Sequence, residues 1–81
     1  MVIRNISAYD EFVEFITSRP SLEEITDFRL SDEIETHISD LLQANRTRRL
    51  TDDENEELDE YLRVEHLMRK AKLRAYEKLD Q

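Results

Sequence analysis

The chain has 81 residues, of which 40% are charged, and its formal net charge is −8. Generic binding to duplex DNA requires cations that neutralise phosphates, so an acidic chain argues against it. The charge instead suits a basic protein partner, or serves solubility alone. The chain contains no cysteine, which excludes disulfides, thiolate metal sites and cysteine nucleophiles. Its length predicts a single domain over residues 1–81.

No apolar stretch approaches the roughly 20 residues of a membrane-spanning helix, and no segment resembles a signal peptide. We therefore expect a cytoplasmic protein with no membrane partner. The high charge raises the question of disorder, but apolar residues recur at helical spacing along most of the chain. With no glycine and one proline, the turns must rely on Ser, Thr, Asn and Asp.

Residues 1–6 are predicted to form an irregular N-terminal segment, and residues 8–18 are predicted to form the first helix. Ser7 can cap this helix. Arg19-Pro20 ends it, because the residue before a proline avoids the helical region. The apolar residues of this helix share one face. They are Ala8, Tyr9, Phe12, Val13, Phe15 and Ile16.

Two further helices are predicted at 22–28 and 32–45. Ser21 and Glu24 have the spacing of a capping box, and Ser31 can cap the later helix. That helix should end near Asn45, since asparagine tolerates the left-handed conformation at a helix C-terminus. The apolar residues along one face of this helix are Ile34, Ile38, Leu41 and Leu42. The arginine-rich connector at 46–49 could neutralise the acidic helix ends or form a local docking point.

The longest helix is predicted at 52–79, and Thr51 and Glu54 form its capping box. Seven acids lie between residues 52 and 60, whereas lysine and arginine dominate the later turns. This order complements the helix dipole. The apolar residues cover an arc of roughly 200°, which is wide for a helix that lies on one neighbour.

This helix is also long for the chain. Residues 51–79 would extend over roughly 43 Å, whereas a compact domain of this size has a diameter of roughly 30 Å. We therefore predict an all-α fold in which three shorter helices pack on one long C-terminal helix. The apolar residues on the part of this helix that extends beyond the compact domain must be covered by a second copy or by another protein. The predicted core comprises Phe12, Ile16, Ile25, Phe28, Ile38, Leu41, Leu58, Leu62 and Met68.

Three segments resemble a group of small bacterial, notably cyanobacterial, proteins of unknown function. They read P-S-L-E-E-I-T-D-F-R at 20–29, N-R at 45–46 and L-T-D-D-E-N-E-E-L-D-E-Y-L-R-V-E-H-L-M-R at 50–69. The pattern L-T-x-x-E-x-x-E-L-D-x-Y-L-x-x-E-H-L-M is the most specific part, and the resemblance covers most of residues 20–76. It implies a small helical protein but no chemistry. Relatives often carry a glycine near Thr47, which is absent here, so that turn is expected to differ.

The residues predicted to make intermolecular contacts are Tyr61, Leu62, Glu65, His66, Met68, Arg69, Lys72 and Tyr76. Glu65 and Arg69 lie inside the apolar arc at i,i+4 spacing. The carboxylate, imidazole and amine of Glu65, His66 and Lys72 could perform acid–base chemistry. No nucleophile or glycine loop accompanies them. The favoured interpretation is a charged seam that sets the register between two helices.

His37 has metal-ligand spacing with Glu33 or Asp40, but the Glu-x-x-His motif of di-iron bundles is missing. A partly buried histidine that binds no metal is therefore favoured. The acidic run at 52–60 lacks the glycine and alternating ligands of a calcium loop, and a solvated helix start is favoured there. No metal or cofactor is predicted.

Tyr61 and Tyr76 near the basic turns at 69–74 suggest nucleic acid binding, because basic residues and aromatics together bind single strands. Both tyrosines fall on the apolar arc, so core tyrosines beside dipole-matched cations are favoured. The sequence thus predicts a non-catalytic protein–protein interaction module that forms a homodimer through residues 58–79. It also predicts an antitoxin-like role with a basic protein partner. A small nucleic-acid-associated regulator that uses the basic C-terminal turns is the alternative, and an enzyme is the least favoured class.

Overall fold

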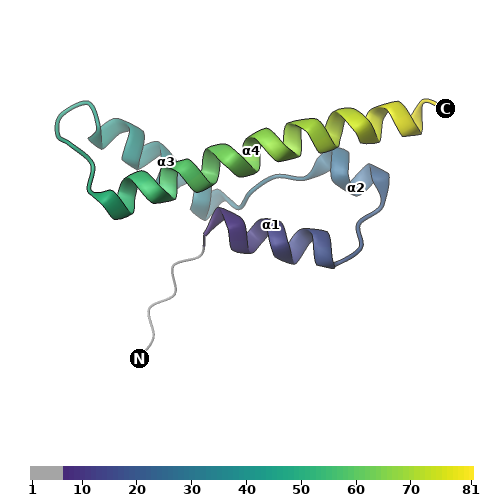
Figure 1. The fold of residues 1–81 in the computed structure, drawn as a ribbon, viewed down its shortest axis with the longest axis horizontal. Coiled ribbons are helices and arrows are strands. Elements are labelled where there is room, and N and C mark those ends of the chain that lie inside the picture. The colour runs from purple at the N-terminus through teal and green to yellow at the C-terminus, as the bar shows by residue number, and fades with distance from the viewer. Residues whose placement is uncertain (1–6) are drawn as a thin grey trace.

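The computed structural model describes residues 7–81, so the predicted irregular N-terminal segment at 1–6 lies outside the described residues. This part of the chain contains four α-helices and no strand, which confirms the all-α class for it (Figure 1). The helices are α1 (Ala8–Thr17), α2 (Leu22–Asp27), α3 (Asp32–Ala44) and α4 (Asp52–Leu79). The first three end one residue before the predicted bounds.

Side-chain caps start each helix, as the sequence predicts. The Thr51 hydroxyl accepts a hydrogen bond from the Glu54 backbone N–H at 3.1 Å. The Glu54 carboxylate in turn accepts one from the Thr51 N–H at 2.9 Å. Ser21 and Glu24 form the same capping box at the start of α2. Ser7 and Ser31 cap α1 and α3. These bonds satisfy backbone donors that a helix leaves unpaired at its N-terminus.

The left-handed residue lies at the end of α1 and not at the end of α3. The helix α3 ends with Asn45 as its C-cap, as predicted, but Asn45 has φ −65° and does not adopt the left-handed conformation, whereas Arg19 has φ 58°. The chain leaves α3 through successive tight turns, in which Arg46 and Thr47 donate backbone hydrogen bonds to Gln43 and Ala44. No left-handed residue is needed there. At Arg19 the reversal comes directly before Pro20, which cannot continue the helix.

The three shorter helices all contact α4, and α4 extends along most of the long axis (Figure 1). The molecule measures 49 × 32 × 18 Å. A helix with its side chains is about 10 Å thick, so 18 Å leaves room for only two layers. The radius of gyration is 14.8 Å, above the roughly 12 Å of a compact chain of this length. One side of α4 therefore faces solvent.

The core lies between α4 and the other helices. Its buried residues are Ala8, Leu30, Ile34, Ile38, Leu41, Leu50, Val64 and Met68. Of the predicted core, Ile38, Leu41 and Met68 are buried, and Phe12, Ile25, Phe28 and Leu58 are partly buried. Ile16 and Leu62 are exposed, so the prediction is wrong for both. The neighbours of α4 cover only one side of its wide apolar arc.

Candidate interaction surface

The outer side of α4 carries a row of exposed apolar side chains. Leu62, Leu73 and Tyr76 are 55%, 58% and 59% exposed. Leu73 follows Leu62 by about three helical turns and Tyr76 follows it by about four, so all three lie on one side of the helix. We call these three residues the apolar stripe. Leu79, near the helix end, is 40% exposed but lies about 100° around the helix from Leu62.

Glu65 and Arg69 lie along the apolar stripe between Leu62 and Leu73. Arg69 is exposed, and Glu65 is half-buried near the Tyr61 phenol, whose pKa it helps to raise. Among residues 7–81, no ion pair joins Glu65 to Arg69. The Arg69 guanidinium is therefore available to a carboxylate of another molecule.

The other predicted contact residues divide between the core and the surface. Met68 is only 5% exposed and belongs to the core. The Tyr61 hydroxyl donates a hydrogen bond to the Glu35 carboxylate at 2.9 Å. Burial and this bond raise the pKa of Tyr61 to about 12. Lys72 is half-buried, whereas His66 is exposed. The structure thus places Tyr61 and Met68 in contacts within the chain and leaves Leu62, His66, Arg69 and Tyr76 open.

Glu65, His66 and Lys72 do not form a connected catalytic group. In the described part of the chain, no hydrogen bond or ion pair links any two of them. Proton transfer requires groups within hydrogen-bond reach of one another or of a bound substrate. This arrangement gives no geometric support to acid–base chemistry at these residues.

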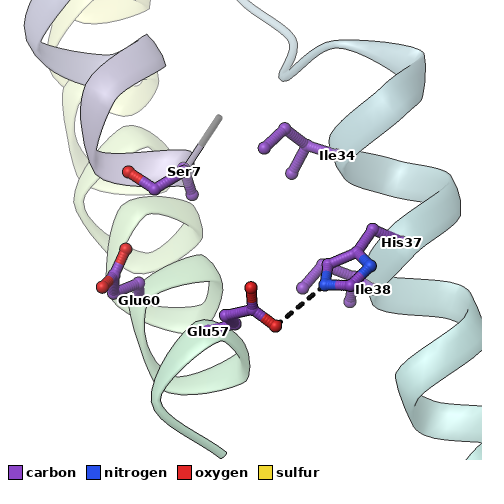
Figure 2. Close-up of a pocket in the computed structure, with 7 residues that line it drawn as sticks. Ser7, Ile34, His37, Ile38, Glu57 and Glu60 are labelled. Atoms are coloured by element: carbon purple, nitrogen blue, oxygen red, sulfur yellow. Dashed lines mark hydrogen bonds and ion pairs between the residues drawn. The ribbon is translucent and has the colours of Figure 1, made fainter. Parts of the chain in front are cut away.

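His37 pairs with α4 and not with the neighbours on its own helix. Its Nε2 lies 2.9 Å from the Glu57 carboxylate (Figure 2). The described residues show no hydrogen bond or ion pair from His37 to the predicted partners Glu33 and Asp40. The His37 side chain is 51% exposed, so the expectation of a partly buried histidine is wrong. The pair joins α3 to the start of α4, where the connector folds the two helices against each other.

A small cavity adjoins this pair (Figure 2). Its volume is about 30 Å³, and its lining comes from α1, α3 and α4. The lining residues are Ser7, Ala8, Ile34, His37, Ile38, Glu57 and Glu60. A site for a metabolite normally measures several hundred Å³, so this space suits about one water molecule. Burial and the nearby Glu56, Asp10 and Glu57 carboxylates raise the pKa of Glu60. Over residues 7–81, no group of three or more His, Asp or Glu side chains is arranged to hold a metal.

One arginine of the connector between α3 and α4 pairs with an acid at the start of α4. Arg48 donates two hydrogen bonds to Glu54, each of 2.9 Å. Together with the Thr51 backbone, Arg48 lowers the pKa of Glu54 to about 2. One of the two roles predicted for the arginine-rich connector is therefore seen at Arg48. Arg46 and Arg49 are exposed.

No family model matches the chain, and no curated protein or solved structure is significantly similar to it. These comparisons do not bear on the cyanobacterial resemblance, which stays a prediction. No helix in the described residues is long and apolar enough to cross a membrane.

The sequence-based list of contact residues omits Leu73, which the structure exposes as fully as Leu62 and Tyr76. Its spacing from those two residues was the signal that could have identified it. Leu67, which is also exposed, lies outside the apolar stripe. It follows Leu62 by five residues, which is about 140° around the helix.

Proposed function

We propose that this protein is a non-catalytic interaction module that self-associates through the apolar stripe of α4. The observation that carries the proposal is the alignment of Leu62, Leu73 and Tyr76, all more than half exposed, along one side of the longest helix. Fully burying a leucine side chain contributes about 1.5–3 kcal/mol. A dimer in which a second copy covers the apolar stripe would therefore be stabilised by the burial of each of these side chains.

The charge pattern along α4 favours an antiparallel pair. Residues 52–60 carry seven acids and no base, whereas residues 63–78 carry six lysines or arginines and two glutamates. An antiparallel partner brings the acidic start of one helix toward the basic end of the other, whereas a parallel partner sets like charges together. Electrostatic attraction thus selects the antiparallel orientation.

A twofold axis near residue 67 gives this pair a definite register. Glu65 of one copy then faces the partner's Arg69, and residues 56–60 lie opposite residues 74–78. The charges that interrupt the apolar stripe become complementary across the interface. Polar groups at such positions are known to fix register in helix pairs. In this arrangement Lys72, which is half-buried, supplies a second cation near Glu65.

Sedimentation velocity at micromolar concentration tests self-association, and we expect a dimer. Leu73→Gln should raise the dimer dissociation constant by at least about tenfold, because about 1.4 kcal/mol of lost burial has that effect. Leu42→Gln is the matched control, since Leu42 is similarly exposed but lies on α3. A monodisperse monomer that keeps its helical circular dichroism would refute the proposal.

Charge exchange tests the pairing between copies. Glu65→Arg and Arg69→Glu should each dimerise more weakly than the natural chain, because each places like charges opposite each other. An equimolar mixture of the two variants should form a heterodimer, since every Arg then faces a Glu. If the mixture dimerises no better than either variant alone, Glu65 and Arg69 do not meet across an interface.

The lack of cysteine allows a direct test of orientation. Gln81→Cys places one thiol at the end of α4. A parallel dimer would bring the two thiols together and form a disulfide under mild oxidation. An antiparallel dimer separates them by roughly the length of α4, about 40 Å. We expect no cross-linked dimer for Gln81→Cys and an efficient cross-link when Asn55→Cys chains are mixed with Gln81→Cys chains.

The net charge of −8 supports a further element of this proposal, a basic protein partner in an antitoxin-like pair. Such a complex should weaken as salt rises from 0.05 to 0.5 M, because the Debye length shortens. A partner recovered from the source cells should therefore elute with salt and should carry a basic isoelectric point. Recovery of acidic proteins alone would argue against this element but not against self-association.

A further inference from the structure

A second group of exposed apolar side chains lies where α1 runs beside α4. Val13 and Ile16 of α1 and Leu67 of α4 are 50%, 46% and 48% exposed. None of them belongs to the apolar stripe. We call this surface the α1–α4 face and define it by these three residues together with Arg63, Lys70, Arg74 and Lys78.

One hydrogen bond fixes how the two helices align. Arg63 donates from Nη1 to the Tyr9 hydroxyl at 3.2 Å. From this contact α1 and α4 run in the same general direction (Figure 1). Val13 and Leu67 each lie one helical turn further along, and Ile16 lies about two turns beyond Tyr9. Val13 and Ile16 therefore lie on the same side of α1 as Tyr9, and Leu67 lies on the same side of α4 as Arg63.

The cations of this face follow the same geometry. Lys70, Arg74 and Lys78 come 7, 11 and 15 residues after Arg63, which places them on one side of α4. All four side chains belong to exposed residues. The ion pairs of residues 7–81 join other residues, so Lys70, Arg74 and Lys78 have no carboxylate partner there. The exposed Glu77, 14 residues after Arg63, is the one acid that follows on this side, so a mainly cationic row borders the apolar side chains on a molecule whose overall charge is negative.

We propose that the α1–α4 face binds an acidic amphipathic helix of another protein. The leucine-like side chains of that helix would cover Val13, Ile16 and Leu67, and its carboxylates would face Lys70 and Arg74. Helix-in-groove recognition uses this division between apolar anchors and flanking charges. This partner is acidic, whereas the partner proposed for the rest of the surface is basic.

Two features distinguish this partner from a nucleic acid and from the dimer contact. Surfaces that bind single strands stack bases on aromatic side chains, whereas the exposed anchors here are aliphatic. Leu67 lies about 140° around α4 from Leu62, so the α1–α4 face and the apolar stripe point in different directions. The protein can therefore bind this partner while it is dimeric, and the inference goes beyond the self-association proposed above.

Fluorescence anisotropy with a designed peptide tests the inference on the full chain. The probe is a labelled helix of about 18 residues, or five turns, with leucines at i, i+3, i+4 and i+7 spacing and glutamates elsewhere. We expect it to bind at low salt and to weaken as salt increases. Lys70→Glu/Arg74→Glu should weaken binding by at least about tenfold, because like charges then face each other. Leu67→Gln should weaken it too.

Matched controls separate the face from its surroundings. Arg46→Glu/Arg49→Glu changes two exposed arginines of the connector, and Leu42→Gln changes an exposed leucine of α3. Both should leave binding unchanged. A probe with serine in place of leucine should bind more weakly. All altered residues are exposed, so circular dichroism should show unchanged helicity.

Three results would overturn the inference. The first is no binding of the acidic probe, or equal binding to Lys70→Glu/Arg74→Glu. The second is tighter binding of a single-stranded oligonucleotide of about 20 nucleotides that the same variant abolishes, since the face would then be a nucleic acid surface. The third is loss of probe binding in Leu73→Gln, because the apolar stripe and not the α1–α4 face would then hold the probe. Loss of the dimer in Leu73→Gln alone bears only on the apolar stripe.

Discussion

The two halves of α4 are held in place by different interactions. In the first half, Glu54, Glu57, Tyr61 and Arg63 each form a side-chain hydrogen bond to a residue outside the helix. In the second half, residues 64–79 form none within the described part of the chain and bury only Val64, Met68 and Ala75. Directional bonds fix where the first half lies, whereas apolar packing, which is not directional, holds the second.

This difference explains why the exposed apolar residues collect toward the end of α4. Short α2 packs against the second half and covers only one side of it (Figure 1). Leu73 and Tyr76 therefore stay open to a partner. A helix fixed at one end and lightly covered at the other can offer a long surface without losing its position.

The largest effect is expected from removing the apolar contact of the second half. Met68 is 5% exposed and packs in the core, so Met68→Ala should lower the free energy of unfolding by about 2–5 kcal/mol. Leu67→Ala is the matched control. Because the Leu67 side chain is exposed, this substitution should change the free energy of unfolding by less than about 0.5 kcal/mol. Urea denaturation with circular dichroism measures both. Similar losses in the two variants would show that the second half is not anchored through Met68.

Local signals in the sequence predict the helices and their caps, because each cap depends on residues three positions apart. The starts of the helices and the capping boxes at Ser21 and Thr51 therefore follow from the sequence. The pairs that position α4 do not. His37–Glu57 and Tyr61–Glu35 join residues 20 and 26 positions apart, and neither partner is marked by its own neighbourhood.

The candidate site was predictable only in part for the same reason. The wide apolar arc of α4 correctly indicates more apolar surface than one neighbour can cover. Which part of the arc is covered depends on where α1, α2 and α3 pack, and this is a tertiary property. Leu62 was therefore expected in the core and is exposed, whereas Met68, on the same arc, is buried.

The next effect concerns the polar anchor between α3 and the first half of α4. Tyr61→Phe removes the hydrogen bond to Glu35 and should cost about 1 kcal/mol. Tyr76→Phe is the control, because Tyr76 is exposed and should change stability by less than about 0.5 kcal/mol. Equal stability of Tyr61→Phe and the natural chain would mean that this bond does not anchor the helix.

The Tyr61 bond also predicts an alkaline pH dependence. Its pKa in the folded chain is raised to about 12 from 10.0, so the folded state holds the proton more tightly. The associated stability is fully present below pH 10 and is lost as pH rises toward 12. Ultraviolet titration of the phenols should show a step near pH 12 that Tyr61→Phe removes. Persistence of that step in Tyr61→Phe would assign it to another tyrosine.

A smaller effect is expected at the start of α4, where Glu54 joins the Arg48 guanidinium to the Thr51 cap. The pKa of Glu54 is lowered to about 2 from 4.5, so its contribution to stability is present above pH 4.5 and is lost as pH falls toward 2. Glu54→Gln should reduce stability at neutral pH and flatten this acid-dependent loss. Glu56→Gln, which removes a charge from the same part of the helix, should leave the loss of stability at acidic pH unchanged.

The smallest effect tests the crowding of acids in the first half of α4. Sequence spacing puts Glu60 on the polar face, but it is half-buried beside α1, and burial and nearby carboxylates raise its pKa. A raised pKa means that the protonated form suits the folded state, so ionised Glu60 opposes folding at neutral pH. Glu60→Gln should therefore increase the free energy of unfolding at pH 7 by up to about 0.5 kcal/mol.

The sign of this effect distinguishes Glu60 from Glu54, which lies in the same half of the helix. Below pH 4.5, the ordinary value, Glu60 is protonated in both folded and unfolded chains, and the advantage of Glu60→Gln should vanish. Glu54→Gln should lose stability under the neutral conditions in which Glu60→Gln gains it. If both substitutions destabilise the chain at pH 7, the acids at the start of α4 act as one favourable group with the helix dipole. If they differ in sign, the paired carboxylate anchors the helix, whereas the crowded one weakens it.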